Sequence, residues 1–469
     1  MPRVDPQPFK LAPHQEYASE MMSGSDQLAL FYEAGTGKTA CVLDYLYQSF
    51  KKGEIQDALV ICPASIVSSW KGAIDKMVQF KGYKPSGVRM MHQMVTIRSF
   101  QKIYERKMVK TRHRDGTVTE KKVLRLRDDI FHKWGAIIVD ESQGLGAHDS
   151  VQTRMCLELS HLTDRRFIMS GTPVSGGGGQ EDFKKLYGQL KFLDPDLWGN
   201  YKEFCAELVT GYDYFNKPNQ YHNEECRALM RAYGIVARLS DCYDIPDTID
   251  MESRIDLTEE CEKVYGDIAG GRSAGYGIEI KTGGAYYLKL LETVSGFVNR
   301  TSNDPDPITV HTAKPNALHD ILNGTDDKVV VFCNFRYSID RAAEVCEKHG
   351  KTVVYDGRST KDTWREFQFG DAKYLVCQYQ SGGVGIDLYA GHTMVFYEPT
   401  LSSLLLEQAK ARIRRKGQTQ RCIYHWICTQ GTVEEQTMDS IRRGMDVSVA
   451  MLEAWALRKP IPEPKPKKK

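Results

Sequence analysis

The chain has 469 residues, of which 41% are hydrophobic and 26% are charged, and its formal net charge is +2 at pH 7. This length allows two or three domains with separate cores, and the composition excludes an intrinsically disordered protein. A membrane-spanning protein is also excluded, because no apolar stretch approaches the roughly 20 residues that a bilayer helix needs. The small net charge indicates no partner by itself, since a nearly neutral protein can still carry a basic groove.

The beginning of the chain, MPRVDPQPFKLAPHQ, lacks the apolar core of a signal peptide. We therefore expect a cytoplasmic protein, or a nuclear one if the source is eukaryotic. The 12 cysteines are scattered singly, without a CxxC pair or a histidine cluster at metal-ligand spacing. They predict reduced, mostly buried thiols and no metal site built from such clusters.

Short apolar runs alternate with amphipathic stretches from residue 28 onward, and the same pattern returns after residue 327. Each run has the length of a strand, ends in Gly, Pro, Ser or Asp, and precedes a segment of helical period. This order is typical of a parallel sheet with crossover helices. Between the two regions, aromatic and charged residues at helical spacing predict inserted helices. The predicted divisions are 1–180 for a first α/β domain, 181–305 for helical insertions and linker, 306–455 for a second α/β domain, and 456–469 for a basic Pro/Lys tail.

The stretch AGTGKT, residues 34–39, follows an apolar run and opens an amphipathic segment. In that context, backbone N–H groups at a helix N-terminus bind an anion, the lysine reaches the outer phosphates, and the threonine holds magnesium. The strict phosphate-loop pattern requires glycine where Tyr32 stands, but the shorter GxGKT form is intact. A plain glycine-rich turn is the alternative. The predicted nucleotide-binding residues here are Gly35, Thr36, Gly37, Lys38 and Thr39.

An acid pair ends the apolar run IIVDESQGLG, residues 137–146. Asp140 and Glu141 are predicted at the carboxyl edge of the same sheet as Lys38, where α/β proteins bind ligands. One acid can hold a magnesium shell while the next activates water. A solvated surface pair is the alternative, and the buried-looking strand before the acids disfavours it. SGTP, residues 170–173, ends another apolar run and supplies hydroxyl groups at this edge.

The segment QAKARIRRKGQ, residues 408–418, carries two arginines three positions apart. Arg412 and Arg415 are therefore predicted to share one helix face. Planar guanidinium groups suit a phosphate whose charge is redistributing, and such an arginine contributes on the order of 10³ to 10⁵ in rate. A solvated basic helix is the alternative, which the neighbouring glutamines and glycine disfavour.

In this order, AGTGKT, VDESQ, SGTP, SGGVGIDL and QAKARIRRKGQ resemble the motifs of superfamily II helicases and translocases. The segments LAPHQEYASEMM, ALVICPASIVSSW and GGVGIDLYAGHTMVFYEP are similar to those of the Swi/Snf-type group. The resemblance spans roughly residues 9 to 437. It implies two RecA-like domains in tandem that close on ATP and Mg²⁺, and a DNA-dependent ATP hydrolase that steps along nucleic acid.

The resemblance also implies roles for single residues in the first domain. Gln15 matches the glutamine that reads adenine. Lys38 and Thr39 match the ligands of phosphate and magnesium. Asp140 matches the residue that binds magnesium through water, and Glu141 matches the general base.

Gln143 stands where many relatives have histidine, at a position that links the nucleotide to the SGTP motif. An amide both donates and accepts hydrogen bonds, so we expect its link to Ser170 or Thr172 to survive the change. These three residues are the predicted coupling residues.

In the second domain, Gly385 and Asp387 match the motif that touches both nucleotide and DNA. Gln408, Arg412 and Arg415 match the arginine-finger motif. Asp387 departs from the asparagine common in the Swi/Snf-type group, and a Trp-Asn-Pro sequence is missing around residues 398–402. These departures predict a divergent member rather than a chromatin remodeller.

A basic hairpin is predicted over residues 105–129, because Asp115-Gly116 is a strong turn signal flanked by alternating residues. It would act as a wedge or branch-point reader beside DNA, with a solvated surface hairpin as the alternative. The predicted nucleic-acid contacts are Arg112, Arg114, Lys121 and Lys122, among the basic residues Lys107, Lys110, Arg125 and Arg127.

We therefore expect a monomeric ATP-dependent DNA motor that unwinds or remodels forked and branched DNA in replication, recombination or repair. The compact chain suggests, by analogy, a bacteriophage or bacterial source. The alternatives are a duplex translocase that does not separate strands, an RNA helicase, and a clamp that uses ATP only as a switch. DNA is the expected partner, and no membrane is expected.

Overall fold

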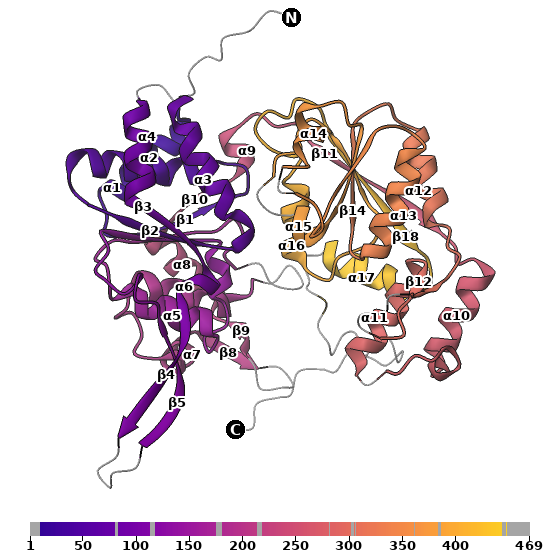
Figure 1. The fold of residues 1–469 in the computed structure, drawn as a ribbon, viewed down its shortest axis with the longest axis horizontal. Helices are drawn as coiled ribbons and strands as arrows, with labels where there is room; N and C mark the ends of the chain where they lie inside the picture. Colours follow the sequence, from indigo (N-terminus) through magenta and orange to yellow (C-terminus); the bar gives the residue numbers. More distant parts are fainter. Residues whose placement is uncertain are drawn as a thin grey trace, which may run out of the picture. The chain divides into compact units, whose positions relative to one another are not determined.

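Two compact units make up the chain (Figure 1). Unit 1 contains Met1–Val174 and Asp182–Tyr243, and unit 2 contains Ser175–Glu181 and Asp244–Lys469. The boundary at Tyr243 falls inside the stretch predicted as insertions and linker, and the predicted domain boundaries stay predictions. The computed structural model describes residues 10–79, 83–112, 118–174, 181–212, 218–280, 282–301, 304, 306–360, 362–382, 386–442 and 447.

Unit 1 is built on a six-stranded sheet in which all neighbouring strands are parallel. The central strands are almost wholly buried, which explains their unbroken apolar sequences. In sheet order the strands are β10 (Gly234–Ala237), β1 (Gln27–Tyr32), β7 (Arg166–Met169), β6 (Ala136–Asp140), β2 (Ala58–Cys62) and β3 (Val95–Ser99).

Helices cover both faces of this sheet, with α1 to α4 on one side and α5 to α8 on the other (Figure 1). Alternate strand residues, such as Phe31, Ile137 and Ile168, pack against α5 to α8 in one apolar cluster. The helices are α1 (Pro13–Ser23), α2 (Lys38–Lys52), α3 (Val67–Lys76), α4 (Pro85–Met94), α5 (Val151–Ser160), α6 (Leu186–Leu193), α7 (Tyr201–Leu208), α8 (Asn223–Tyr233) and α9 (Leu239–Cys242).

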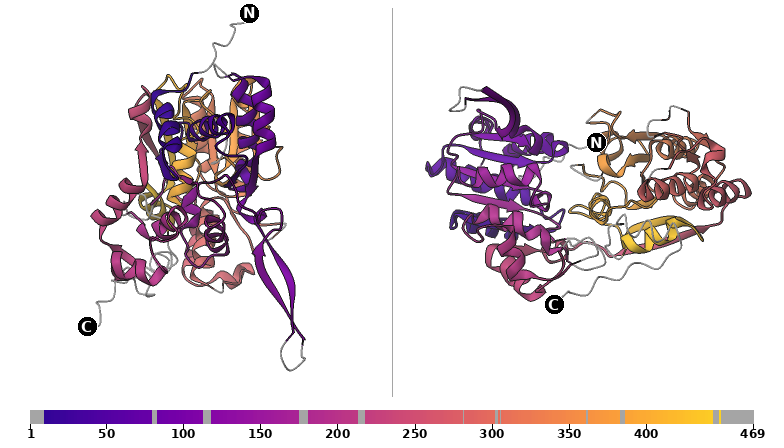
Figure 2. Two further views of the ribbon diagram at one scale, coloured as in Figure 1. Left: turned by 90° about the vertical axis from the view of Figure 1, so that its left-hand side faces the viewer. Right: turned by 90° about the horizontal axis from the view of Figure 1, so that it is seen from below.

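The predicted basic hairpin is present and extends from the body of unit 1 (Figures 1 and 2). Its strands β4 (Tyr104–Arg112) and β5 (Val118–Leu126) pair antiparallel from Tyr104↔Leu126 to Arg112↔Val118. The predicted turn at Asp115-Gly116 and the side chain of Arg114 lie outside the described residues. A second, irregular pair joins β8 (Val209–Tyr212) to β9 (Pro218–Tyr221).

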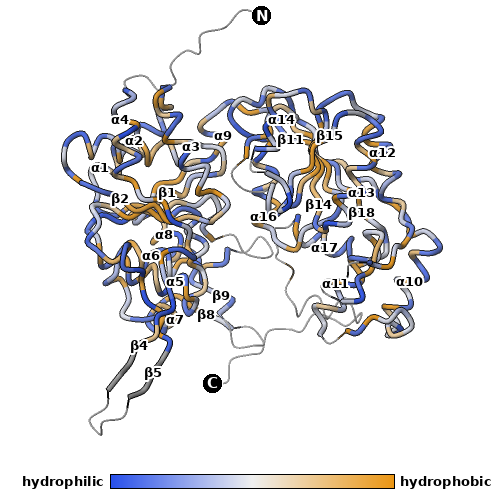
Figure 3. Tube along the Cα trace, viewed as in Figure 1, coloured by the Kyte–Doolittle hydropathy of each residue, from blue (hydrophilic) through white to orange (hydrophobic). Residues whose placement is uncertain are grey.

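Unit 2 contains a second six-stranded parallel sheet, with an apolar cluster on each face. Figure 3 shows the hydrophobic strands at the centre of each unit. The two sheets confirm the predicted fold class, α/β with two RecA-like parallel-sheet domains in tandem. In sheet order the strands are β11 (Thr248–Ile255), β18 (Cys422–Thr429), β17 (Thr393–Phe396), β14 (Val329–Cys333), β16 (Tyr374–Gln378) and β15 (Thr352–Tyr355).

The helices of unit 2 include a satellite pair, α10 and α11, with its own apolar cluster. After these two helices, the short strands β12 (Phe297–Val298) and β13 (Ile308–Thr309) pair antiparallel. The helices are α10 (Glu259–Ala269), α11 (Gly283–Val294), α12 (Lys314–Asn323), α13 (Arg336–Glu347), α14 (Arg365–Phe369), α15 (Tyr379–Gly382), α16 (Ser403–Lys410) and α17 (Val433–Arg442).

The predicted tail at 456–469 lies outside the described residues. Within the described ranges, no helix combines the length and the apolarity needed to cross a membrane. The cysteines form no disulfide in the described part of the chain, and all except Cys205 and Cys242 are buried, as the sequence predicts.

Candidate active site

The phosphate loop connects β1 to α2 at the carboxyl edge of the unit 1 sheet. Gly35 and Gly37 both adopt φ of 88°, a left-handed conformation that favours glycine, and Gly37 caps the N-terminus of α2. The helix begins at Lys38, whose Nζ donates to the Tyr32 carbonyl at 2.7 Å. Backbone N–H groups and a lysine thus gather at a helix N-terminus, as an anion site requires.

Two side chains from α1 bind the outside of this loop. Gln15 Nε2 donates to the Thr36 carbonyl at 2.9 Å, and His14 Nε2 lies 2.8 Å from the same oxygen. Gln15 is buried, and a Cβ added at Gly37 would lie 2.1 Å from its Nε2. Gln15 therefore lies against the phosphate loop, whereas its predicted reading of adenine stays a prediction. His14 was missed by the sequence reasoning, although it directly precedes Gln15.

The acid pair stands at the end of β6, and its first member is tightly held. Asp140 is buried, Trp70 Nε1 donates to its Oδ2 at 2.8 Å, and the Glu141 backbone N–H donates to its Oδ1 at 2.9 Å. Burial and the charge of Glu141 raise the pKa of the Asp140 carboxyl, while the indole hydrogen bond and Lys38 oppose this rise. Trp70, on α3, was missed because its contact spans 70 positions of the chain.

Gln143 connects the acid pair to the SGTP motif. Its Nε2 donates to Glu141 Oε2 at 2.6 Å, and its Oε1 accepts a hydrogen bond from Ser170 Oγ at 2.6 Å. Ser170 Oγ in turn accepts from the Thr172 backbone N–H at 3.1 Å. The amide uses both of its functions at once, so the structure contains the expected hydrogen bond to Ser170.

The order of strands explains this assembly. In the sheet, β7 lies between β1 and β6, and all three run parallel, so their following loops meet at one edge. Gly171 follows β7, and a Cβ added there would lie 3.2 Å from the Ala34 nitrogen and 3.5 Å from Lys38 Nζ. The loops after β1, β6 and β7 therefore bring the predicted residues of unit 1 together.

The donor set at this edge fits a magnesium ion. Mg²⁺ prefers oxygen ligands and is usually held by one or two carboxylates together with phosphate oxygens. The buried Asp140 carboxylate and the Thr39 hydroxyl at the start of α2 are ligands of this kind. The residues present are therefore compatible with the predicted ion.

In unit 2, the predicted arginines converge on the loop after α15, although not from a helix. Arg412 Nη1 and Arg415 Nη1 both donate to the Ile386 carbonyl, at 3.1 and 3.2 Å, and Arg415 is ion-paired with Asp387. The prediction of a shared helix face was wrong, because α16 ends at Lys410 and residues 411–417 form turns and a bend.

Gln408 lies in α16, and its carbonyl accepts from Arg412 Nε at 2.8 Å. Gly385 lies outside the described residues. In the hairpin, Lys122 is exposed, whereas the side chains of Arg112 and Lys121 lie outside the described part.

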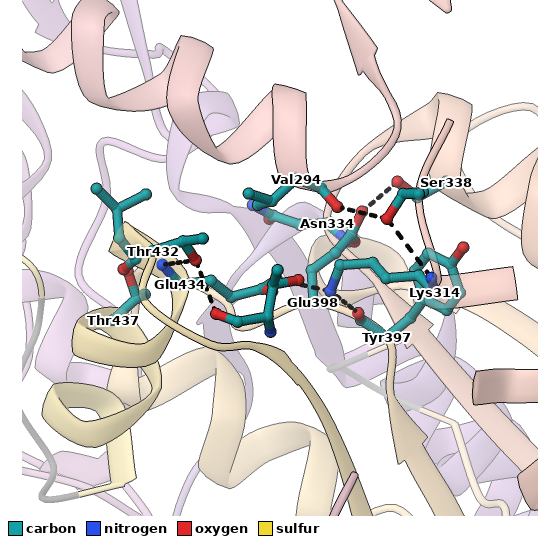
Figure 4. Close-up of polar contacts among 12 residues, drawn as sticks. Val294, Lys314, Asn334, Ser338, Tyr397, Glu398, Thr432, Glu434 and Thr437 are labelled. Atoms are coloured by element: carbon teal, nitrogen blue, oxygen red, sulfur yellow. Dashed lines mark hydrogen bonds and ion pairs between the residues drawn. The ribbon is translucent and has the colours of Figure 1, made fainter. Parts of the chain in front are cut away.

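A buried ion pair occupies the core of unit 2. Lys314 and Glu434 are fully buried, and Lys314 Nζ donates to Glu434 Oε1 at 2.7 Å and to the Tyr397 carbonyl at 2.8 Å (Figure 4). Beside them, Glu398 accepts from the Asn334 backbone N–H at 2.7 Å and from Ser338 Oγ. Burial raises the pKa of the Glu398 carboxyl, and the charge of Lys314 opposes this rise. The group joins the segments that follow β14, β17 and β18.

The chain matches the family described as SNF2-related domain over residues 14–293 and the family described as helicase conserved C-terminal domain over residues 313–417.

Among curated relatives, an uncharacterized ATP-dependent helicase of Mycoplasma genitalium is 24% identical over 86% of this chain and 38% of its own length. The DNA repair and recombination protein RAD54 of Saccharomyces cerevisiae is 22% identical over 90% of this chain and 53% of its own length. The chain thus spans about two fifths to a half of the length of these relatives. Among solved structures, the Sulfolobus solfataricus SWI2/SNF2 ATPase core in complex with dsDNA aligns with a TM-score of 0.42 and 19% identity, covering 99% of this chain and 100% of that one.

Proposed function

Because the chain belongs to the SNF2-related family, we propose that it is an ATP-dependent motor that moves on DNA and remodels forked or branched DNA. The observation that carries this proposal is the assembly at the carboxyl edge of the unit 1 sheet. A phosphate loop, a buried acid pair and a glutamine bridge meet there on the loops after β1, β6 and β7.

Each residue of this edge receives a role in ATP hydrolysis. Backbone N–H groups of Gly35 to Gly37 and the Lys38 ammonium bind the phosphates. Thr39 and, through water, Asp140 would hold magnesium, which would supply charge neutralisation to the phosphates. Gln143 engages Glu141 Oε2, so Oε1 is the atom that we assign to accept the proton of the attacking water.

In unit 2, Arg412 and Arg415 are assigned to stabilise the charge that develops on the transferred phosphoryl group. Guanidinium groups suit this task because they stay protonated and present fixed donors. The Ile386 carbonyl accepts from both guanidinium groups, and the Asp387 carboxylate pairs with Arg415, so these contacts orient the two arginines. Gln408 supports Arg412 through its carbonyl, and Gly385 is assigned to the same loop by its motif alone.

The hairpin β4/β5 supports the more specific proposal of branched DNA as substrate. It extends from unit 1 and carries basic residues along both strands, which suits contact with the phosphates at a branch (Figure 2). Most contacts of such a motor are expected to fall on phosphates, so binding should be tolerant of sequence and sensitive to salt. Replication, recombination or repair of DNA, and a phage or bacterial source, remain part of this proposal.

The test is ATP hydrolysis and strand separation measured side by side on single strands, blunt duplex, forks, four-way junctions and RNA. We expect DNA to stimulate hydrolysis and forks or junctions to be remodelled. Stimulation by duplex without strand separation would instead support a pure duplex translocase, and stimulation by single-stranded RNA alone would support an RNA helicase.

The matched variant for this test is Glu141→Gln. It should bind ATP normally but hydrolyse it at least about 10²-fold more slowly, because the general base is lost while the shape is kept. A clamp that uses ATP only as a switch would keep its DNA response in this variant. Full hydrolysis in Glu141→Gln would contradict the assignment of the base.

A further inference from the structure

Gln189 forms a second connection between two loops of the candidate active site. We call residues 140–145 the acid-pair turn and residues 170–173 the SGTP turn. Ser142 Oγ donates to Gln189 Oε1 at 2.7 Å, and Gln189 Nε2 donates to the Pro173 carbonyl at 2.9 Å. Gln189 lies in α6, so one helix side chain reaches both turns.

The hydrogen bonds of this amide are complete. Its second Nε2 proton donates to the Lys185 carbonyl at 2.9 Å, and both Gln189 and Ser142 have no exposed surface. Because both Nε2 partners are carbonyl oxygens, the orientation of the amide is determined, and its oxygen faces the Ser142 hydroxyl. A buried, fully bonded amide of this kind resists displacement, because any shift of either turn would break a hydrogen bond away from water.

A glycine allows α6 to lie directly against the acid-pair turn. A Cβ added at Gly188 would lie 2.2 Å from the Leu145 carbonyl and 3.1 Å from the Leu145 Cβ. Any side chain at position 188 would push the helix away. The hydrogen bond between Gln189 and Ser142 therefore depends on this close approach of the two backbones.

The two bridges hold different ends of the SGTP turn. Gln143 binds Ser170, at the start of the turn, and Gln189 binds Pro173, at its end. A turn held at one end can pivot, whereas a turn held at both ends must move with the acid-pair turn.

We propose that Gln189 is a positioning residue that couples the acid-pair turn to the SGTP turn, so that each hydrolysed ATP moves the motor along DNA. Gln189 has no exposed surface, so it would act on the two turns through its hydrogen bonds to Ser142 and Pro173. The inference rests on the proposed motor function and deepens it.

The test uses Gln189→Met in the full chain, because methionine keeps the length of the side chain and removes every hydrogen bond. ATP hydrolysis and displacement of a third strand from duplex DNA are measured in the same reaction. We expect displacement per ATP to fall by about fivefold or more, the lower end of ordinary coupling between sites. The KM for ATP should change by less than about twofold, since no contact to nucleotide is lost.

Gln152→Met is the matched control. Gln152 Nε2 donates to the Gly144 carbonyl at 3.1 Å, so it contacts the acid-pair turn without reaching the SGTP turn. Its displacement per ATP should equal that of the wild type. Ser142→Ala breaks the same bridge at its other end, and its effect combined with Gln189→Met should be clearly less than the sum of both.

Several outcomes would overturn the inference. A parallel fall of hydrolysis and displacement in Gln189→Met, together with a lower melting temperature, would assign the residue to stability alone. If Gln189→Met does not fold, unchanged displacement per ATP in Ser142→Ala decides against the bridge. A wild-type protein without DNA-stimulated hydrolysis would overturn the proposed function and this inference together, whereas normal wild-type coupling with an unaffected Gln189→Met would overturn the inference alone.

Discussion

Glu141 has the backbone conformation that sets the geometry of the acid pair. Its φ of 52° is the one positive value at a non-glycine residue in the described part of the chain. Such a conformation costs about 1–3 kcal/mol and persists only where the surroundings hold it. Here the Glu141 N–H bonds to Asp140, and its carboxylate bonds to Gln143. The strain therefore lies at the residue that we assign as the base, where it directs two successive carboxylates to different partners.

Gln143→Ala should uncouple hydrolysis from movement more than it weakens ATP binding. The substitution removes the bridge from Glu141 to Ser170 and leaves the phosphate loop untouched. We expect DNA unwinding per ATP to fall by about fivefold or more, with the KM for ATP nearly unchanged. Gln143→His, which installs the residue of many relatives, is the control that should retain coupling. A raised KM with normal unwinding per ATP would refute the relay.

Trp70→Phe should weaken magnesium binding. The indole N–H opposes the rise of the Asp140 pKa, so its loss raises that pKa further and leaves more of the carboxyl protonated near neutral pH. Magnesium must then displace a proton, and the deficit should shrink as the pH rises. We expect the magnesium concentration for half-maximal binding of a fluorescent ATP analogue to rise about tenfold.

Trp134→Phe provides the comparison, because Trp134 is a buried indole of the same unit that donates to the Ile130 carbonyl. It should leave the magnesium titration unchanged. An equal shift in both variants would point to general loosening of unit 1 instead of a specific effect on Asp140.

At the scale of elements, the sequence predicted the strands well because burial leaves a local signal. Apolar runs ending in AGTGKT, DESQ and SGTP correspond to β1, β6 and β7, and their parallel order places the motifs together. The contacts of Trp70 and Gln189 leave no such signal in the sequence. Trp70 binds Asp140, which is 70 positions away, and Gln189 binds Ser142, which is 47 positions away. In the sequence alone, a tryptophan or glutamine at helical spacing predicts only a residue packed in the core. Its functional partner becomes visible only when the folded sheet is known.

The end of α16 shows how tertiary contacts override a helical pattern. Residues 408–418 suit a helix by composition, but the Arg412 carbonyl accepts from the Leu388 N–H at 3.0 Å. That carbonyl is then bonded across the fold, and the chain turns, with Gly417 at a φ of 100°. The arginines still reach a common carbonyl because their side chains are long, although the helix face predicted for them is absent.

The hairpin β4/β5 can be shortened without disturbing the core of unit 1. Leu124 and Leu126 pack against that core, and Lys107 pairs with Val123. Replacing residues 108–122 with an Asn-Gly turn therefore keeps a short hairpin and removes its basic end. We expect fork unwinding and junction migration to fall by about tenfold and to depend less steeply on salt, since several phosphate contacts are lost.

Hydrolysis stimulated by blunt duplex should stay within about twofold of the wild type in this variant, because the phosphate loop and acid pair are unchanged. A second variant keeps the hairpin at full length and replaces its lysines and arginines with glutamine. It distinguishes a steric role of the hairpin from a role of its positive charge. Unchanged activity on forks and junctions after shortening would remove the hairpin from the mechanism.

At the scale of the whole molecule, each unit has its own sheet and its own apolar clusters. Unit 2 additionally contains the buried Lys314–Glu434 pair with Glu398 beside it (Figure 4). Units with separate hydrophobic cores unfold as separate cooperative domains. A defect in this cluster should therefore weaken unit 2 and spare unit 1.

Lys314→Met tests this separation. It leaves two buried carboxyl groups without their cation and should destabilise unit 2 by about 3–5 kcal/mol. The folded-state pKa of Glu398 is already raised, so this carboxyl disfavours the folded state increasingly as the pH rises, and the loss of Lys314 enlarges the effect. The deficit should accordingly shrink as the pH is lowered and Glu398 becomes protonated. Hydrogen exchange read peptide by peptide should show lost protection in β14, β17 and β18 but not in β1, β6 and β7.

Lys351→Met is the control, since Lys351 is an exposed lysine of the same unit whose ion pair with Glu366 is screened by solvent and should contribute little to stability. Equal loss of protection in both units after Lys314→Met would mean that the chain unfolds as a single cooperative body. A loss no larger than in Lys351→Met would mean that the buried pair contributes no more than a surface one. The expected pattern, a large loss confined to unit 2, would show that the arginines of unit 2 and the phosphate loop of unit 1 rest on independently stable scaffolds.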